Sequence, residues 1–459
     1  MAPGPDLRHR RGMPTNHLSA AQLADLTPPT RDRYVDFLRA LAIVAVVIGH
    51  LVVADVRYGV AGFSGHNALG DVAALRWATL VFQVMPLFFV VGGYANAASW
   101  ASARRRGVGS GGWLHSRLSR LARPAGAFVV VWTLAVIVLA GIGADDLAAT
   151  AGRLVVFPLW FLPVYVVAIS AAPALWRAQQ RWGGRVAGLL LGAVVVTDLL
   201  RFAGGVPFVG LVNMVLVWLA FQQVGFCWHA GLVGSARDGR RLLAAAGAAL
   251  VALVVVGPYA VDMVSAPGRG ASNTAPPTVA LLVFGLAQFG LALAARGPVT
   301  RWLERPPVWA AVIALNARAM TLYLWHFTAI VLAAVVVLPA GIAQPAAGTG
   351  TWWWLRPVWL AAELTLLVGL TAAVGRWERG WPGAPVSLPR ALSIAGLLTA
   401  GFVALTTQGF WPDGQINWLS SMALGVATVL LVATVTTGEP TVGGRGRGAE
   451  PETASCAES

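Results

Sequence analysis

Long apolar segments recur along this chain from residue 37 to residue 436, with no polar domain between them. A helix that crosses a bilayer needs about 20 mostly apolar residues, and these segments have about that length. The composition agrees, because 57% of the residues are hydrophobic and 11% are charged, against about 45–50% and 25% in soluble globular proteins. The pattern excludes an ordinary soluble protein and predicts an all-α, polytopic integral membrane protein.

Twelve spanning helices are predicted, and the arginines give an independent check on that number. The segments are 36–56, 76–98, 124–143, 154–175, 185–202, 206–228, 241–261, 277–295, 315–338, 353–376, 391–409 and 417–436. Of the 33 basic residues, all arginine, 25 lie in the two tails and in alternate loops, at 101–123, 176–185, 229–241, 296–307 and 376–390. Such asymmetry marks the cytoplasmic side. We therefore expect a multi-pass protein of the plasma (inner) membrane with both termini in the cytoplasm and no nucleic-acid partner.

Composition divides the chain into four parts. Residues 1–34 and 438–459 lack hydrophobic periodicity and are predicted to be disordered cytoplasmic tails. Residues 35–380 form the predicted membrane core, and residues 381–437 add two further transmembrane helices. The two cysteines, Cys227 and Cys456, have neither metal-ligand spacing nor a plausible disulfide framework. We therefore predict no metal site.

Ionisable groups inside a membrane-spanning segment are costly to bury and are functional candidates. On the first predicted helix, Arg39 and His50 are eleven residues apart, which places them within about 20° of one face and about 16 Å apart along the axis. Asp36 precedes Arg39 by three residues and is within reach of a salt bridge. In a purely structural alternative, Arg39 extends to the interface and His50 makes one hydrogen bond between helices.

A second group of charges lies in the segment 101–123. Arg117 and Arg120 are spaced i,i+3, so on a helix both guanidinium groups point to one side and can clamp a phosphate. The alternative is that these arginines only face anionic lipid and set the topology.

The ninth and tenth predicted helices carry the remaining candidates. Tyr323, Trp325 and His326 lie well inside the ninth span, and Glu363 lies inside the tenth. His326 and Glu363 can orient His50 or bind an acceptor, and packing through a hydrogen bond is an equal alternative. Five amide side chains in the predicted spans can line the same cavity or simply join helices; they are Gln83, Asn96, Asn213, Gln222 and Gln223.

Four segments, in order, resemble the motifs of the integral membrane acyltransferase-3 family. They are Arg39 and His50 separated by ten residues and preceded by Asp36, MPLFFVVGGY at 85–94, the RxxR pair Arg117 and Arg120, and LYLWH at 322–326. Together they cover most of residues 31–380. The chain departs from the family pattern at Gly92, where members often have serine, and in the last two helices, which exceed a ten-helix core. We expect no appended hydrolase-like domain, although some members carry one.

The resemblance implies an O-acyltransferase that moves an acyl group, most simply acetyl, from acyl-CoA to a hydroxyl of a carbohydrate, glycolipid or glycosylated metabolite. Acyl-CoA would be a co-substrate rather than a permanently bound cofactor. Arg117 and Arg120 would hold its phosphates, while Arg39 would contact the pyrophosphate or hold Asp36. His50 would take the hydroxyl proton or form an acyl-histidine.

The same resemblance gives supporting roles to the late helices. Glu363 or His326 would orient His50, and Tyr323, Asn213 or a backbone N–H would stabilise the oxyanion. Trp325 would contact the substrate. Two other protein classes stay open from the sequence alone, a twelve-helix secondary transporter and a non-catalytic scaffold of envelope assembly.

Overall fold

The structure, a computed structural model, describes residues 31–60, 62–265, 272–341, 344–375 and 384–436. The helices are α2 (Arg33–Val53), α3 (Ala73–Phe82), α4 (Met85–Arg105), α5 (Ser110–Gly141), α6 (Asp145–Leu154), α7 (Phe161–Trp182), α8 (Arg185–Phe202), α9 (Asn213–His229), α10 (Ala236–Val256), α11 (Val279–Trp302), α12 (Pro306–Ala317), α13 (Ala319–Val337), α14 (Gly350–Val374), α15 (Leu388–Gln408) and α16 (Trp418–Thr436). Short 3-10 turns are η3 (Phe157–Trp160), η4 (Val209–Val212), η5 (Leu338–Ala340) and η7 (Pro412–Gly414).

A helix lies at each of the twelve predicted positions, which confirms the all-α, polytopic fold. Within the described residues, ten helical segments are long and apolar enough to cross a membrane. The other two predicted spans correspond to α8, which carries three ionisable side chains, and to the shorter apolar helix α16. The predicted tails fall mostly outside the described residues, although α2 already begins at Arg33.

Three local features differ from the sequence prediction. The predicted span 76–98 is two helices, because Pro86 lies in the first turn of α4 and disfavours helical backbone just before it. The Gln83 side chain accepts a hydrogen bond from the Met85 N–H at this break. The predicted loop 101–123 is largely helical, since α4 continues to Arg105 and α5 begins at Ser110. An antiparallel hairpin, β1 (Ala54–Gly59) and β2 (Gly62–Asn67), follows α2 with Ala54 opposite Asn67.

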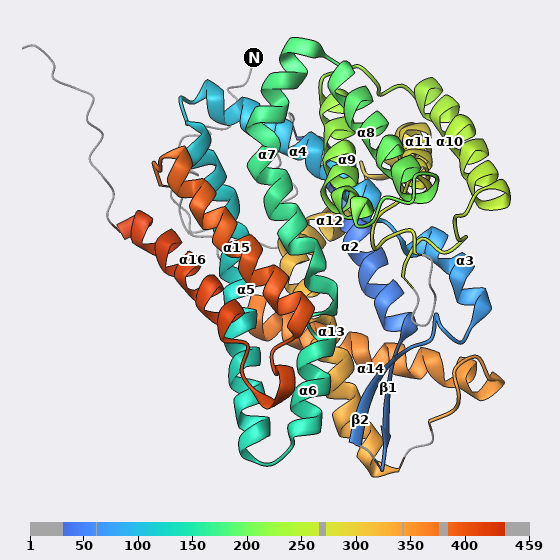
Figure 1. Ribbon diagram of the computed structural model, residues 1–459, viewed down its shortest axis with the longest axis vertical. Coiled ribbons are helices and arrows are strands. Elements are labelled where there is room, and N and C mark those ends of the chain that lie inside the picture. Colours follow the sequence, from blue (N-terminus) through green and yellow to red (C-terminus); the bar gives the residue numbers. More distant parts are fainter. Residues whose placement is uncertain (1–30, 61, 266–271, 342–343, 376–383, 437–459) are drawn as a thin grey trace, which may run out of the picture.

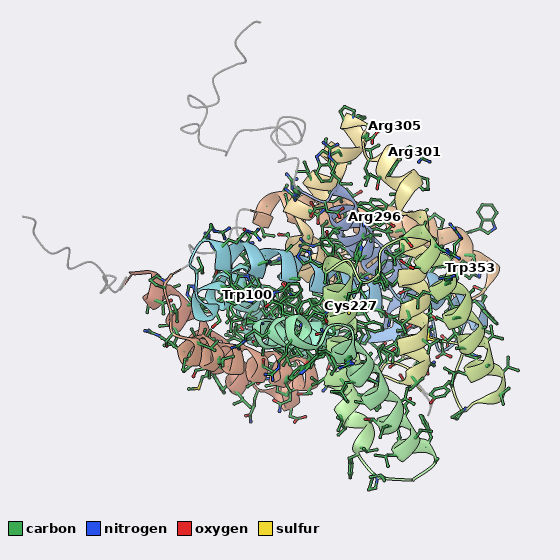
Figure 2. All side chains as sticks on the ribbon, turned by 90° about the horizontal axis from the view of Figure 1, so that it is seen from above. Trp100, Cys227, Arg296, Arg301, Arg305 and Trp353 are labelled. Atoms are coloured by element: carbon green, nitrogen blue, oxygen red, sulfur yellow. The ribbon has the colours of Figure 1, made fainter. Side chains whose placement is uncertain are left out.

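Turns that were predicted on one face of the membrane lie at one end of the molecule (Figure 1). The α4–α5 and α7–α8 turns lie at the upper end, whereas the hairpin and the α5–α6 and α15–α16 turns lie at the lower end. Successive turns in these parts of the chain therefore lie at opposite ends of the molecule, as the predicted alternation requires. Figure 2 shows three of these arginines, Arg296, Arg301 and Arg305, along the end of α11 and the turn into α12.

The last two helices pack into the core instead of forming a separate unit. They lie beside α5 in Figure 1, and α15 contacts both α5 and α7. Phe402 and Phe410 are buried, and Phe410 packs against Phe128 and Trp132 of α5. The pair thus covers one side of the bundle.

A very close helix crossing joins α4 to α9. A Cβ atom on Gly93 would lie 2.2 Å from the Gln222 carbonyl oxygen, and one on Gly225 would lie 2.0 Å from the Val90 carbonyl oxygen. Only glycine permits this approach at either position. The resulting contact places the polar groups of α4 against those of α9.

Candidate active site

Two histidines from distant parts of the chain meet in the interior. Nδ1 of His50, on α2, lies 2.9 Å from Nε2 of His326, on α13. The ring centroids are 5.1 Å apart and the ring planes differ by 5°. α13 packs directly against α2, so the two helices fix this geometry. The sequence predicted that either His326 or Glu363 would pair with His50. Among the described side chains, His326 is the one of the two that does so.

The hydrogen bonds determine which nitrogen of each neutral ring carries a proton. Nδ1 of His326 lies 2.7 Å from the backbone carbonyl of Tyr323, and a carbonyl can only accept. His326 therefore donates from Nδ1, and its Nε2 accepts from Nδ1–H of His50. Nε2 of His50 is left with a free lone pair, as a general base requires.

His50 forms part of the wall of a cavity of ≈570 Å³. His326 lies behind it and is 0% exposed. The cavity is bounded by the ends of α2 and α7, by α3 and by the α10–α11 loop, at the end of α2 away from Arg39. A ligand in this cavity can contact His50, whereas His326 does not line the cavity.

The three residues proposed to contact substrate are placed differently from one another. Tyr323 lines the cavity, but its hydroxyl donates to the Pro158 carbonyl. Trp325 is buried edge-on against Phe128 of α5, with ring centroids 5.4 Å apart. Asn213 donates to the Asp198 carboxylate at 3.1 Å. The structure therefore brings only Tyr323 to the cavity beside His50.

Asp198 holds the two ends of the α10–α11 loop, which forms part of the cavity wall. Besides Asn213, its carboxylate accepts from the Tyr259 hydroxyl at 3.2 Å and from the Val279 N–H at 2.7 Å. These three hydrogen bonds join α8 to the start of α9 and to both ends of the α10–α11 loop.

The arginines form a separate cluster toward the N-terminal end of α2. Arg117 lies within electrostatic range of Arg120 and Arg39 and of the Tyr165 hydroxyl. Its guanidinium carbon lies 5.5 Å from the centre of the Trp113 ring. Arg117 is partly buried and Arg120 is exposed. The structure thus brings together the three predicted arginines, of which Arg39 lies about 16 Å from His50 along α2.

Asp36 does not make the predicted salt bridge with Arg39. Its carboxylate instead lies 2.5 Å from Nε of Arg31, which precedes the helix and can fold back over its first turn. Arg39 is left free of a carboxylate partner among the described residues. Asp36 is about 21 Å from His50 along the helix axis, given a rise of about 1.5 Å per residue.

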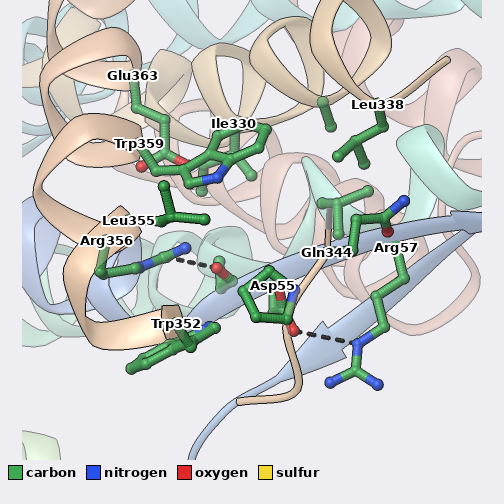
Figure 3. A pocket seen from close by; sticks show the side chains of 14 residues that line it. Asp55, Arg57, Ile330, Leu338, Gln344, Trp352, Leu355, Arg356, Trp359 and Glu363 are labelled. Carbon is green, nitrogen blue, oxygen red and sulfur yellow. Dashed lines mark hydrogen bonds and ion pairs between the residues drawn. The ribbon is translucent and has the colours of Figure 1, made fainter. Parts of the chain in front are cut away.

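Glu363 lies in a second, smaller cavity of ≈40 Å³ (Figure 3), lined also by Asp55, Arg57 and Arg356. Glu363 and Arg356 lie on the same side of α14 and interact electrostatically. Arg356 donates to the backbone carbonyls of Leu51 and Ala54, the latter at 2.6 Å. Arg356 therefore holds the end of α2 that carries His50.

Sequence reasoning did not assign Arg356 a role. The available signal was an arginine within the predicted tenth span, in WWWLRPVW, where a charge demands a partner. The partner is the carboxyl end of a helix, which attracts cations because its last carbonyls are unpaired. That arrangement depends on tertiary contacts and has no sequence motif.

The remaining buried amides mainly join helices. Gln222 accepts from Asn96 of α4 at 3.2 Å and donates to the Ala168 carbonyl of α7 at 2.8 Å. Gln223 donates to Gln179 at 2.6 Å. Of the five, only Gln83 lines the His50 cavity. Across the described ranges, no group of three or more His, Cys, Asp or Glu residues is placed to hold a metal ion.

A family model described as "Acyltransferase domain" matches residues 32–376 of the 459. This is more than half of the chain, and it includes both histidines and the arginine cluster while ending before α15. No curated protein and no solved structure matches the chain.

Proposed function

The chain belongs to this acyltransferase family, and from that premise we propose that it transfers an acyl group, most simply acetyl, from acyl-CoA to a hydroxyl. The acceptors that the family resemblance implies are glycans, glycolipids and glycosylated metabolites. Acyl-CoA would act as co-substrate, with no permanently bound cofactor. The family match does not favour the transporter alternative.

The hydrogen-bonded pair of His50 and His326 at the wall of a cavity is the observation that carries this proposal. The hydrogen bonds from the Tyr323 carbonyl through His326 fix the His50 ring, and the tautomer inferred from them leaves the lone pair of Nε2 available. A base with a fixed lone pair can take the proton of a hydroxyl held within hydrogen-bond reach. The second histidine acts as an orienting acceptor and touches neither reactant.

In the proposed reaction, Nε2 of His50 accepts the acceptor's hydroxyl proton while the oxygen attacks the thioester carbonyl carbon. The tetrahedral intermediate then collapses, the carbon–sulfur bond breaks, and the imidazolium returns the proton to the departing thiolate. His326 keeps a hydrogen bond to Nδ1–H throughout and stabilises the transient cation. Direct attack by Nε2 on the thioester would instead leave an acyl-histidine.

The arginine cluster of Arg39, Arg117 and Arg120 would hold the donor. Three guanidinium groups with no carboxylate among their described partners suit the phosphates of CoA. From that cluster the thioester end of the donor would extend along α2 toward His50. Phosphate binding and acyl transfer would then take place at two separate positions.

The proposed orientation places the arginine cluster in the cytoplasm, where acyl-CoA is found, and the chain in the plasma membrane. The 25 arginines on one side support it. Reporter fusions after residues 110, 270, 345 and 440 test it. Cytoplasmic activity is expected at 110 and 440 only; a cytoplasmic reporter at 270 or 345, or an external one at 110 or 440, would refute the orientation.

The activity itself is tested by CoA release. Purified protein in nanodiscs is given acetyl-CoA and a panel of glycan, glycolipid and glycosylated acceptors, and free thiol and acylated product are both measured. We expect acceptor-dependent CoA release that the His50→Gln variant loses. Donor binding without CoA release for any acceptor would favour a carrier or a scaffold.

A further inference from the structure

The polar side chains in the wall of the His50 cavity are almost all engaged with other protein groups. Thr79, Gln83 and Thr274 all bond to the backbone of Met263, at 3.0, 2.9 and 2.8 Å. Each of these side chains therefore uses a hydrogen bond to fix the α10–α11 loop. Tyr323, as described above, donates to a carbonyl.

The two remaining wall hydroxyls are engaged as well. Ser265 pairs with Ser272 at 2.6 Å, and Thr406 donates to the Phe402 carbonyl one turn earlier on its own helix, at 2.8 Å. Among the described wall side chains this leaves Nε2 of His50, the indole N–H of Trp160 and the exposed Arg153 to meet a ligand's polar groups, while the wall hydroxyls can at most accept a further hydrogen bond. The rest of the wall is apolar, and includes Val46, Phe82, Met85, Phe157, Phe161 and Met214.

This distribution discriminates between acceptors. A sugar ring in the cavity would bring several hydroxyls against a wall that offers them few partners, and every unsatisfied hydroxyl weakens binding by about fivefold or more. Each methylene buried against the same wall strengthens binding by about fourfold. A volume of ≈570 Å³ is in the range of cavities that enclose a small organic molecule.

We propose that the cavity selects an acceptor whose reacting hydroxyl is attached to an apolar skeleton, such as a lipid or a polyketide-like ring. This inference rests on the proposed function, because it takes His50 as the base. Among the acceptors considered above, it favours a lipid-linked or otherwise apolar molecule over a free polysaccharide.

We assign most of the cavity to the acceptor, and of the donor only the thioester and its acyl group would reach His50 from the arginine cluster. Nε2 of His50 must contact the hydroxyl from which it takes a proton. The atoms that carry this hydroxyl are therefore adjacent to His50, inside the cavity. The donor enters from the arginine cluster, at the opposite end of α2.

Two alcohols of equal ring size test the proposal. Cyclohexylmethanol and methyl β-glucopyranoside each carry a hydroxymethyl group on a six-membered ring, but only the glucoside has further ring hydroxyls. CoA release from acetyl-CoA is measured with each alcohol, using the full-length protein in nanodiscs. We expect kcat/KM to be at least tenfold higher for cyclohexylmethanol, and a glucoside that is equal or better would overturn the proposal.

Two matched variants locate the effect. Ala78, on α3, lines the cavity, whereas Ala311, on α12, lines an apolar groove on the outer surface. Ala78→Phe should lower kcat/KM for cyclohexylmethanol at least tenfold, and Ala311→Phe should leave it within twofold. Equal losses in the two variants would show that the preference does not arise in the cavity.

A binding measurement separates failure of this proposal from failure of the proposed function. Radiolabelled cyclohexylmethanol is titrated against the His50→Gln protein, with and without Ala78→Phe, and against empty nanodiscs. Saturable binding that Ala78→Phe removes supports the proposal even if no alcohol is acylated. Binding equal to that of empty nanodiscs overturns it.

The last arm asks whether the donor fills the cavity instead. Octanoyl-CoA and acetyl-CoA are compared with methyl β-glucopyranoside as acceptor. We expect no advantage for octanoyl-CoA. A tenfold advantage that disappears in Ala78→Phe would assign the cavity to the acyl chain and overturn our assignment.

Discussion

The two ends of α2 present opposite environments. At the N-terminal end, Arg39 lies with Arg117 and Arg120 in a cationic cluster that is partly open to solvent. At the other end, His50 and His326 are paired in an apolar interior, with His326 0% exposed. α2 therefore carries a charged arginine, Arg39, and a neutral basic histidine, His50, on the same face.

This difference separates binding from chemistry. Phosphate recognition tolerates water, because charge-assisted hydrogen bonds to arginine persist at an interface. Proton transfer benefits from exclusion of water, because a fixed lone pair in an apolar wall needs no reorganisation to accept a proton. Substitutions at the arginine end should change donor affinity, and substitutions at the histidine end should change turnover.

The largest expected effect is that of His50→Gln. Removing the base should lower acyl transfer by roughly 10²–10⁴-fold, the usual contribution of positioned acid–base catalysis. Donor affinity should be unchanged, because the proposed phosphate contacts are about 16 Å away along the helix. Single-turnover transfer and equilibrium acyl-CoA binding are measured on the same preparation. Retention of more than about a tenth of wild-type turnover would exclude His50 as the base.

The arginine end should respond in the opposite way. Arg117→Ala or Arg120→Ala removes a charge-assisted contact of about 1.5–3 kcal/mol, or about tenfold or more in donor affinity. The maximal single-turnover rate at saturating acyl-CoA should stay near that of the wild type.

Lysine variants at the same positions refine this test. Arg117→Lys and Arg120→Lys should recover only part of the affinity, because an ammonium group cannot reproduce the two-pronged contact of a guanidinium. If both alanine variants insert normally and bind acyl-CoA as the wild type does, the cluster serves topology alone.

The smallest expected effect concerns Asp36→Asn. The salt bridge with Arg31 is partly exposed, with side-chain exposures of 11% for Asp36 and 45% for Arg31, and such pairs contribute about 0–1 kcal/mol. Turnover and donor affinity should therefore stay within about threefold, and the thermal stability should fall slightly. A loss of a hundredfold in turnover would mean that Asp36 takes part in the chemistry after all.

Much of the fold was predictable, because apolar length and loop charge are local properties of the sequence. The twelve helical positions follow from them, as does the sharing of one face by Arg39 and His50. The hairpin after α2 was not predicted, since Ala54 and Val56 continue the apolar run of the preceding helix. The break before α4 coincides with Pro86, a boundary signal that apolar periodicity alone does not take into account.

The candidate site was predictable only in part. Sequence reasoning selected His50 and offered His326 as one possible partner, but the two positions are 276 residues apart, and spacing along one helix says nothing about contacts to another. For the same reason it could not choose between His326 and Glu363 as the partner of His50. The positions of Arg356 and of the α10–α11 loop depend entirely on tertiary packing.

The central claim is that His50 and His326 act as one unit, with His326 fixing the lone pair of His50. The most direct test is a double-mutant cycle on transfer rate with His50→Gln, His326→Leu and the double variant, all shown to bind acyl-CoA normally. Residues that act as a unit are not additive, so the double variant should be no slower than His50→Gln alone. His326→Gln should recover part of the rate lost in His326→Leu, because its amide oxygen can still accept from Nδ1–H of His50. Losses that multiply in the double variant, with no recovery by glutamine, would contradict the account.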